Sequence, residues 1–480
     1  MKIEPLVLKL NFKITPIEAF RRLSALKHLF FLDGGTTGGK FSFLSGDPCA
    51  FLELQNGNLC SKGLKNNNNL KPLDSLKEIY RSVKLKNIPD LPFFQGGLAG
   101  LWGYGLNCLL ENIPPVSDEA IETPDFALGL YDWSLGFDLT TEEAYIFSTG
   151  LPETETTQRL QRAKKRLNQI IQVLQNDPAT IDHEWVPFLK YELQKKFPQK
   201  DGFLTDVSMT DYCDGVAKCV EYIHAGDCFQ INYTQRFWYP TFCSDKELYL
   251  HIRKECPAPY SGYFETTNGA IISASPERFI CSDGSSVTTK PIKGTRRRGS
   301  TIEEDEKLAN DLVHSAKDRA ENVMIVDLLR NDLGKSCKFG SVKVDEICKL
   351  ESYSNVHHLV SSVSGVLKDG FDNLDLLLGC FPGGSVTGAP KVRAMQIIAE
   401  LEKSPRGIYC GSLGYLGFNG AMDTNILIRS IYSSRGWLQF GSGGGIVSDS
   451  VPESEYQEML TKASGLIRAI KNHPFNNLKL

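Results

Sequence analysis

The segment SPERFICSDGSSVTTKPIKGTRRRG, residues 275–299, is the stretch from which the rest of the chain can be interpreted. Short apolar and β-branched runs flank the turn sequence Ser282–Ser286, so the segment predicts two antiparallel strands joined by a tight turn. The hairpin would bring an acid, Glu277, and a lysine, Lys293, to comparable heights on paired strands. Pro291 and Gly294 bracket this lysine and constrain its backbone. Glu277 and Lys293 alone do not establish a functional site, because most lysines on strands are solvated surface residues.

Composition restricts the classes of protein that the chain can belong to. It has 480 residues, a formal net charge of −4, 41% hydrophobic residues and 23% charged residues, which is ordinary for a globular protein with a large core. The longest basic cluster, Arg296–Arg298, is too short for a nucleic-acid footprint. No apolar run reaches the roughly 18 residues of a membrane span. We therefore expect no nucleic-acid partner and no membrane contact.

Cysteine usage and the N-terminus predict the compartment. The thirteen cysteines are scattered without CxxC pairs or Cys/His metal spacing, which predicts free thiols in a reducing environment. The first residues, MKIEPLVLKLNFKITP, lack a continuous apolar core and a cleavage site typical of a signal peptide. Both observations predict a cytoplasmic protein.

Periodicity along the chain predicts a mixture of strands and helices. Residues 1 to about 150 predict mostly strands, and the polar stretch 176–202 predicts a linker, which divides the chain into an N-terminal region, 1–200, and a C-terminal region, 201–475. Apolar residues at helical spacing predict helices over residues 157–175, 304–332 (as one helix or two in sequence), 392–402 and 453–470. The segment Thr424–Tyr432 predicts a single alternating strand that contains Arg429.

Two acidic pairs lie on predicted helices. Asp318 and Glu321 are three residues apart, as are Glu455 and Glu458, so each pair shares one helical face. Two converging carboxylate pairs would suit Mg²⁺, a hard cation that prefers oxygen ligands and retains water. Two exposed helix faces are the alternative interpretation, and the spacing alone does not exclude it.

Two glycine-rich stretches precede helices. FPGGSVTGAPK, residues 381–391, leads into the helix predicted from residue 392, where backbone N–H groups would attract an anion such as a carboxylate. It lacks the GK[ST] of a P-loop, and a plain structural loop fits it equally well. GSGGG, residues 441–445, would let a ligand lie against the backbone beside the closing helix.

Taken together, these stretches resemble the chorismate-utilising enzymes. The resemblance covers about residues 202–471 closely, and the N-terminal half less closely through SFLSGDP at 42–48 and GGLAGLWGYG at 96–105. It is carried, in family order, by SPERF, PIKGTRRRG, AENVMIVDLLRNDLG, VHHLVS, FPGGSVTGAPKVRAM, GYLGFNGAMDTNILIRS and GSGGGIVSDSVPESEYQE. It implies an α+β fold, a two-layer antiparallel β-sandwich flanked by helices, in which the N- and C-terminal halves are interlaced.

The resemblance also implies roles for individual residues. PIKGT is typical of the branch in which the lysine attacks C2 of chorismate, so Lys293 is expected to be the nucleophile and Glu277 the general acid for the C4 hydroxyl. Gln230 occupies the position where water-using members carry a general-base lysine. Glu321 and Glu458 are expected to bind Mg²⁺, with Asp318 and Glu455 in or near its water shell. Positions expected to contact the substrate or support the lysine are Thr295, His358, Thr387, Tyr415, Arg429, Gly443, Gly444 and Gly445.

The implied reaction is amination of chorismate at C4 to 4-amino-4-deoxychorismate, the precursor of 4-aminobenzoate and folate. The chain carries no GxCxG nucleophile elbow, so a separate glutamine amidotransferase subunit is expected to supply the ammonia. The first alternative is amination at C2 followed by loss of pyruvate, which gives anthranilate; Lys293 argues against it. The second is a regulatory subunit without activity, against which the acids and Lys293 together argue.

Overall fold

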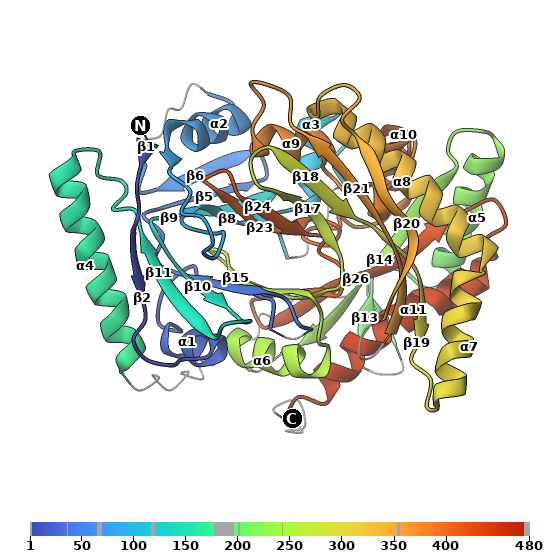
Figure 1. The fold of residues 1–480 in the computed structure, drawn as a ribbon. Coiled ribbons are helices and arrows are strands. Elements are labelled where there is room, and N and C mark those ends of the chain that lie inside the picture. The colour runs from blue at the N-terminus through green and yellow to red at the C-terminus, as the bar shows by residue number, and fades with distance from the viewer. Residues whose placement is uncertain are drawn as a thin grey trace.

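The computed structural model describes residues 2–35, 37–64, 70–116, 121–176, 196–199, 202–241, 243–352 and 356–474. Within these residues two large, predominantly antiparallel sheets face each other and helices cover their outer faces (Figure 1). The linker predicted over 176–202 lies largely outside the described residues. None of the helices in the described part of the chain combines the length and apolar character that a membrane span requires.

The first sheet has 13 strands within the described residues. Their order is β12 (Phe197–Pro198), β13 (Leu204–Thr205), β14 (Gln230–Pro240), β26 (Trp437–Ile446), β25 (Ser430–Ser434), β16 (Ala270–Ser275), β15 (Tyr260–Glu265), β3 (Phe30–Asp33), β4 (Phe41–Ser45), β10 (Trp133–Asp138), β11 (Glu143–Ser148) and β2 (Leu6–Lys9), with β22 (Gly388–Ala389) paired to β14. Strands from both halves of the chain thus share one sheet.

The second sheet has 11 strands within the same residues. Their order is β19 (Ile292–Arg297), β21 (Val356–Val366), β18 (Ser286–Lys290), β17 (Arg278–Ser282), β24 (Met422–Asn425), β23 (Ser412–Gly417), β8 (Gly97–Trp102), β9 (Phe126–Tyr131), β5 (Ala50–Gln55) and β6 (Asn58–Lys62), with β20 (Lys343–Ser352) paired to β21. The short strands β1 (Lys2–Ile3) and β7 (Lys84–Leu85) pair separately. The predicted interlaced β-sandwich is confirmed.

The helices begin and end where local sequence signals place them. Ser208 and Asp211 form a capping box at the start of α5, and Pro452 occupies the first turn of α11. The helix predicted over 304–332 is two helices, α7 and α8. The full set is α1 (Pro16–Arg22), α2 (Pro72–Ser82), α3 (Asn107–Leu110), α4 (Thr156–Gln175), α5 (Met209–His224), α6 (Asp245–Glu255), α7 (Ile302–Val313), α8 (Ala316–Ser336), α9 (Asn373–Cys380), α10 (Lys391–Leu401) and α11 (Pro452–Lys471).

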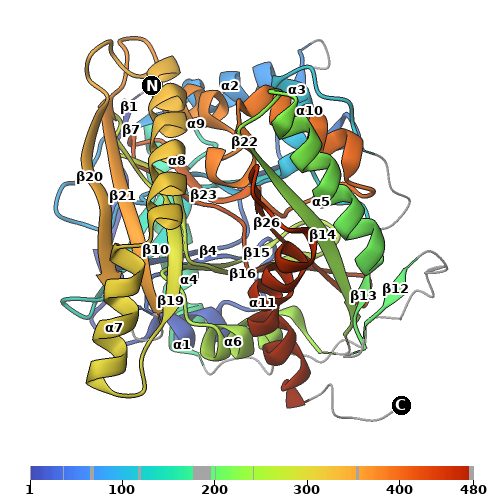
Figure 2. The same cartoon turned by 90° about the vertical axis from the view of Figure 1, so that its right-hand side faces the viewer.

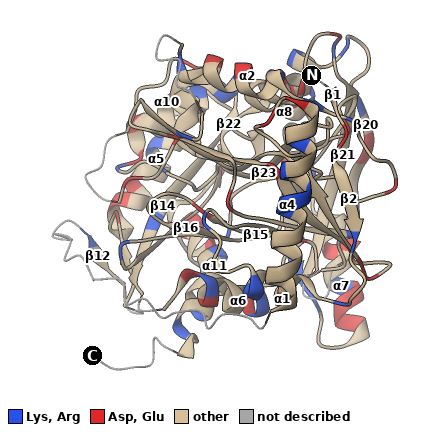
Figure 3. Ribbon diagram, turned by 90° about the vertical axis from the view of Figure 1, so that its left-hand side faces the viewer, with Lys and Arg blue, Asp and Glu red and all other residues tan. Residues whose placement is uncertain are grey.

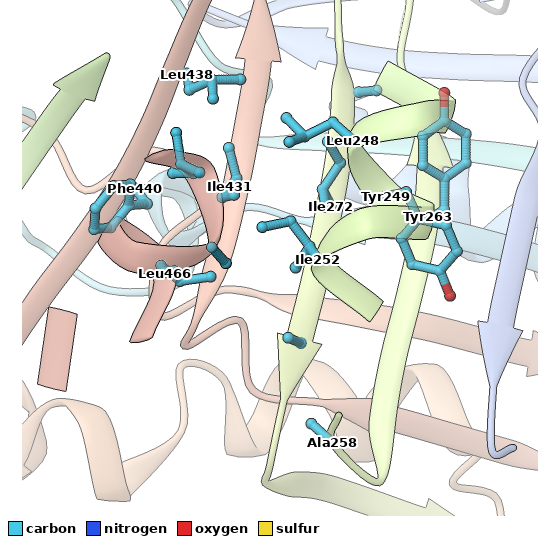
Figure 4. Close-up of a cluster of buried hydrophobic side chains, with 14 of the residues drawn as sticks. Leu248, Tyr249, Ile252, Ala258, Tyr263, Ile272, Ile431, Leu438, Phe440 and Leu466 are labelled. Atoms are coloured by element: carbon cyan, nitrogen blue, oxygen red, sulfur yellow. The ribbon is translucent and has the colours of Figure 1, made fainter. Parts of the chain in front are cut away.

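Three apolar clusters hold these layers together. An aromatic cluster that includes Phe30, Phe94 and Tyr415 fills the space between the sheets. A second cluster joins the first sheet to helices such as α6 and α11 (Figure 4), and a third joins the second sheet to α2, α8 and α9. Helix α4, which carries several basic residues, lies on the outer side of the first sheet (Figure 3) and contributes Ile170 and Leu174 to the second cluster.

Two predicted strand arrangements are wrong in detail. Lys293 does not lie on the strand paired with β17: the chain breaks at Pro291, and β18 and β19 follow one another along β21. The strand predicted over Thr424–Tyr432 is also broken, because β24 belongs to the second sheet and β25 to the first. Arg429 lies at this crossing with φ 50°, a left-handed conformation that a regular strand does not contain.

Candidate active site

A cavity of about 660 Å³ opens between β14, β19, β26, α8 and α11. These elements lie together on the side of the molecule that Figure 2 turns toward the viewer. The cavity wall is completed by the short helical turn Gly384–Val386 and by the crossing that carries Arg429. Most of the residues predicted to form a site lie in this wall, although they come from segments far apart in the sequence.

Lys293 projects into the cavity from β19. Its Nζ lies 3.4 Å from the carbonyl oxygen of Ser385, and it forms no ion pair among the described residues. Desolvation within the protein lowers the pKa of Lys293, and the positive charge of Lys462 lowers it further, whereas Glu277 and Glu321 oppose the shift. Gly294, with φ 75°, lets β19 pass α8 closely, because a Cβ there would lie 3.0 Å from Asp318.

Glu277 faces the same cavity from the bend between β16 and β17. It is buried, its backbone carbonyl accepts the N–H of Ile426, and its carboxyl hydrogen-bonds the side chain of Ser385. Burial raises the pKa of Glu277 to about 7, although the Ser385 bond and the Lys293 charge both oppose this. Burial therefore favours a neutral amine at Lys293 and a protonated acid at Glu277, the forms that a nucleophile and a general acid require.

The four predicted metal-binding acids all line the cavity. Asp318 accepts a bond from Arg296 at 3.0 Å, Glu455 accepts one from Ser450 at 2.7 Å, and Glu458 pairs with Lys462 at 2.8 Å. Within the described residues, no group of three or more His, Cys, Asp or Glu side chains converges closely enough to hold a metal.

Glu321 and Glu458 are the pair whose electrostatics suit a cation. Burial raises the pKa of Glu321, and the negative charges of Asp318 and Glu458 raise it further. Burial acts in the same direction on Glu458, but the positive charges of Lys462, Lys317 and Lys293 together outweigh it and leave the pKa of Glu458 below its ordinary value. Two mutually repelling carboxylates on a cavity wall fit an ion such as Mg²⁺, which takes few protein carboxylates and keeps several waters.

Arg429, His358 and Thr295 form a second group on the cavity wall. Burial lowers the pKa of Arg429, and no carboxylate of the described residues pairs with this guanidinium. Burial also lowers the pKa of His358 to about 4, and its Nδ1 lies 2.8 Å from Thr295 Oγ1. The site thus presents a cation suited to an anionic ligand beside a neutral imidazole.

Three predicted substrate contacts lie elsewhere. Tyr415 is buried between the two sheets, 4.8 Å from the Phe94 ring and outside the cavity, because β23 points this side chain toward the aromatic core. Thr387 is fully buried behind the wall, where its hydroxyl bonds Gly383 O at 3.1 Å. Gly443 and Gly445 line the cavity, whereas Gly444 lies at its margin, where a Cβ would stand 3.4 Å from Glu455 Oε2 and 3.5 Å from Lys462 Nζ.

Sequence reasoning missed several cavity residues, among them three with polar side chains. Tyr409 lies in the wall six residues before Tyr415, Lys462 bonds Glu458 and the carbonyl of Gly443, and Asn232 enters from β14. Lys462 could have been found, because it follows Glu458 by four residues on the same helix. Tyr409 carried no comparable signal, since it lies in an irregular segment before β23.

Comparisons with known proteins identify the family of the chain. Residues 28–468 match the family model described as chorismate binding enzyme. Aminodeoxychorismate synthase component 1 from Escherichia coli (strain K12) is 36% identical over 460 residues, which cover 94% of this chain and 95% of that protein. Anthranilate synthase component 1 from Thermus thermophilus is 35% identical, with 95% of each chain covered.

A solved structure extends the agreement to the fold. The crystal structure of anthranilate synthase component I from Streptococcus pneumoniae TIGR4 superimposes with a TM-score of 0.76 and is 32% identical. The match covers 89% of this chain and 92% of that one. Both names occur among these relatives at nearly the same identity, 36% and 35%, so identity at this level does not choose between the two activities.

Proposed function

Because the chain belongs to the chorismate-binding enzymes, we propose that it aminates chorismate at C4. Its relatives make it a chorismate-utilising enzyme of the aminodeoxychorismate and anthranilate synthase component I type. The product would be 4-amino-4-deoxychorismate, as for an aminodeoxychorismate synthase component I. The observation that carries the proposal is Lys293, an amine without an ion pair inside the cavity, whose pKa burial lowers.

Lys293 and Glu277 would perform the first half of the reaction. The neutral amine of Lys293 attacks C2 of the ring, the double bond shifts, and the C4–O bond breaks. Glu277 gives its proton to the departing hydroxyl, which leaves as water. The raised pKa of Glu277, about 7, keeps about half of this carboxyl protonated at neutral pH, so an acid form is available to the reaction.

The second half reverses the shift of electrons. Ammonia attacks C4, the double bond returns, and the bond between C2 and the Lys293 nitrogen breaks. The lysine recovers its lone pair, and the ammonium group formed at C4 gives up one proton, which restores the acid form of Glu277. The net reaction exchanges a hydroxyl for an amino group and releases water. Arg429, placed in the cavity wall without a carboxylate partner among the described residues, would hold a substrate carboxylate, and the neutral His358 would lie beside the ring.

Glu321 and Glu458 would hold Mg²⁺. Asp318 and Glu455, whose carboxylates are positioned by bonds from Arg296 and Ser450, would orient the waters of the ion. Bound there, the ion supplies positive charge opposite a substrate carboxylate. A Glu321→Gln variant should need a higher Mg²⁺ concentration for half-maximal turnover, whereas Glu346→Gln, on the solvated strand β20, should not.

The ammonia would come from a separate glutamine amidotransferase. The names of the relatives support this, because each is called component 1 of its synthase. Glutamine-dependent turnover should therefore require a second protein, while ammonium salts should support turnover by this chain alone.

Product analysis tests the proposal. The chain is incubated with chorismate, MgCl₂ and NH₄Cl, and the product is examined by mass spectrometry and fluorescence. We expect a non-aromatic amino compound that retains the pyruvyl group. Fluorescent anthranilate would overturn C4 amination in favour of the reaction of the Thermus and Streptococcus relatives, and absence of Mg²⁺-dependent chorismate turnover would indicate a subunit without activity.

A further inference from the structure

Asn232 is a buried amide in the cavity wall that the mechanism above does not use. It lies on β14, is 8% exposed, and its Oδ1 has no hydrogen-bond partner among the described residues. A buried amide oxygen left without a donor costs about 1–3 kcal/mol, so such a group calls for a ligand or another specific explanation.

The backbone of Asn232 is fixed on both sides. Its N–H donates to the carbonyl of Thr387 at 2.7 Å, and its own carbonyl accepts from Nη2 of the buried Arg406 at 2.6 Å. In the sheet it stands opposite Gly445, which has no side chain to meet it. The backbone is therefore held in place, and rotation about the broad terminal torsion of the side chain can turn the oxygen toward a donor in the cavity.

This position is close in the fold to both reacting groups. Thr387, which binds the Asn232 backbone, ends the helical turn that begins at Gly384. In the same turn Ser385 accepts from Lys293 through its carbonyl and bonds Glu277 through its side chain. One short segment thus connects Asn232, the proposed nucleophile and the proposed acid.

We infer that Asn232 is the binding residue for the incoming ammonia, which it holds through an N–H···Oδ1 hydrogen bond. This inference rests on the proposed function. Ammonia has three N–H donors and one lone pair, and the lone pair must point at the carbon that it attacks. Only acceptors can orient it in this way, and Asn232 offers an acceptor that no described residue satisfies.

The neutral character of the amide suits this role. A carboxylate at the same place would favour ammonium, whose nitrogen has no lone pair for the attack. An amide also cannot remove a proton from water, so it would give a competing water molecule no activation. Asn232 would therefore favour ammonia over both competitors without adding a charge to the cavity.

Kinetics with ammonium chloride as the nitrogen source test the inference. Wild type, Asn232→Ala and the matched control Gln439→Ala are compared at saturating Mg²⁺ and fixed pH. Gln439 is another buried amide whose oxygen has no partner among the described residues, but it lies outside the cavity wall. We expect Asn232→Ala to lower kcat/KM for ammonium about tenfold or more while KM for chorismate stays within about twofold, as one lost hydrogen bond predicts.

The isosteric Asn232→Asp gives a second readout that a purely structural role would not move. Its carboxylate should stabilise bound ammonium, so the pH of maximal rate should move upward relative to wild type. Unchanged kcat/KM for ammonium in Asn232→Ala, or parallel losses for ammonium and chorismate together with an unshifted Asn232→Asp profile, would overturn the inference. If wild type itself forms no C4-aminated product, the proposed function fails instead, which separates the two results.

Discussion

Helix α8 connects two regions that each contain a lysine out of bulk solvent, and the two lysines differ in what surrounds them. At its C-terminal end, Asp332 lies 2.6 Å from Nζ of the buried Lys391, which also donates to the carbonyl of Cys380 at 2.7 Å. At its N-terminal end, Asp318 and Glu321 face the cavity that contains Lys293, whose Nζ, among the described residues, hydrogen-bonds only the carbonyl of Ser385, at 3.4 Å.

The difference shows that partners, and not burial alone, decide what such a lysine does. A close carboxylate and a carbonyl compensate the desolvated charge of Lys391, so this residue can stabilise the packing of α8 against α10. Lys293 is desolvated without an ion pair, which lowers its pKa and leaves room for a ligand. The first arrangement suits structure and the second suits chemistry.

The largest expected effect is on stability at the paired lysine. Lys391→Met leaves Asp332 buried with its nearest cation removed, so we expect a loss of about 3–5 kcal/mol in the free energy of unfolding by urea. Burial already raises the pKa of Asp332, and the variant should raise it further, so the loss should grow as pH rises. Lys403→Met, an exposed lysine near the end of α10, should change stability by less than about 0.5 kcal/mol. A loss no larger than that of Lys403→Met would show that the pair is dispensable.

At the cavity lysine the effect should be on activity. Lys293→Met should lower turnover of chorismate with ammonium about 10²-fold, near 2.7 kcal/mol in the barrier, because the nucleophile is lost. Its stability should equal or exceed that of wild type, since an unpaired desolvated amine is replaced by an apolar chain. Lys290→Met, on the preceding strand and outside the cavity, is the matched control. Full turnover by Lys293→Met would show that the amine of Lys293 takes no part in the reaction, so that neither lysine is catalytic.

The acid beside Lys293 predicts a dependence of stability on pH. Because the pKa of Glu277 is raised from 4.5 to about 7 in the folded protein, folding binds a proton between these values, so this residue's stabilisation is present at low pH and lost as pH rises from about 4.5 to 7. Glu277→Gln should remove this component, so its stability relative to wild type should increase over that window by about 3 kcal/mol. Urea unfolding at several pH values measures the difference, and parallel curves for the two proteins would contradict the raised pKa.

The smallest effect is expected at the second lysine near Asp332. Lys335 lies 3.6 Å from Asp332, but its side chain is 46% exposed, so solvent screens the interaction. Lys335→Ala should cost less than about 1 kcal/mol in urea unfolding. A cost similar to that of Lys391→Met would mean that Lys335 and Lys391 stabilise the buried charge of Asp332 to the same extent.

Local signals predicted much of the fold and part of the site. The capping box at Ser208 and the apolar spacing of α4, α10 and α11 were enough to place those helices. The acidic pairs on α8 and α11 do line one cavity, as their shared helical faces suggested. Helical periodicity is a property of neighbouring residues, so it survives without knowledge of the rest of the chain.

Strand-borne positions were harder to predict. Thr424–Tyr432 alternates like one strand, yet it crosses between the sheets at Arg429, and that crossing turns the guanidinium into the cavity wall. Tyr409 and Tyr415 are six residues apart, but only Tyr409 lines the cavity, because β23 lies inside the second sheet between β8 and β24 and Tyr415 packs into the aromatic cluster. A strand's sequence does not state which of its buried faces meets a neighbour and which meets a cavity.

The sequence by itself determined the chemical groups of this protein: an acid in SPERF, a lysine in PIKGT, and two acidic pairs on helices. It also determined the class of fold, since residue identity and short-range spacing are written in the chain. Only the tertiary structure decided that these groups share one cavity, that Lys293 lacks the partner that Lys391 has, and that Asn232 joins them. Desolvation and pairing depend on segments hundreds of residues apart, such as β14 against β26, and the free energies that set a pKa arise only when those segments meet.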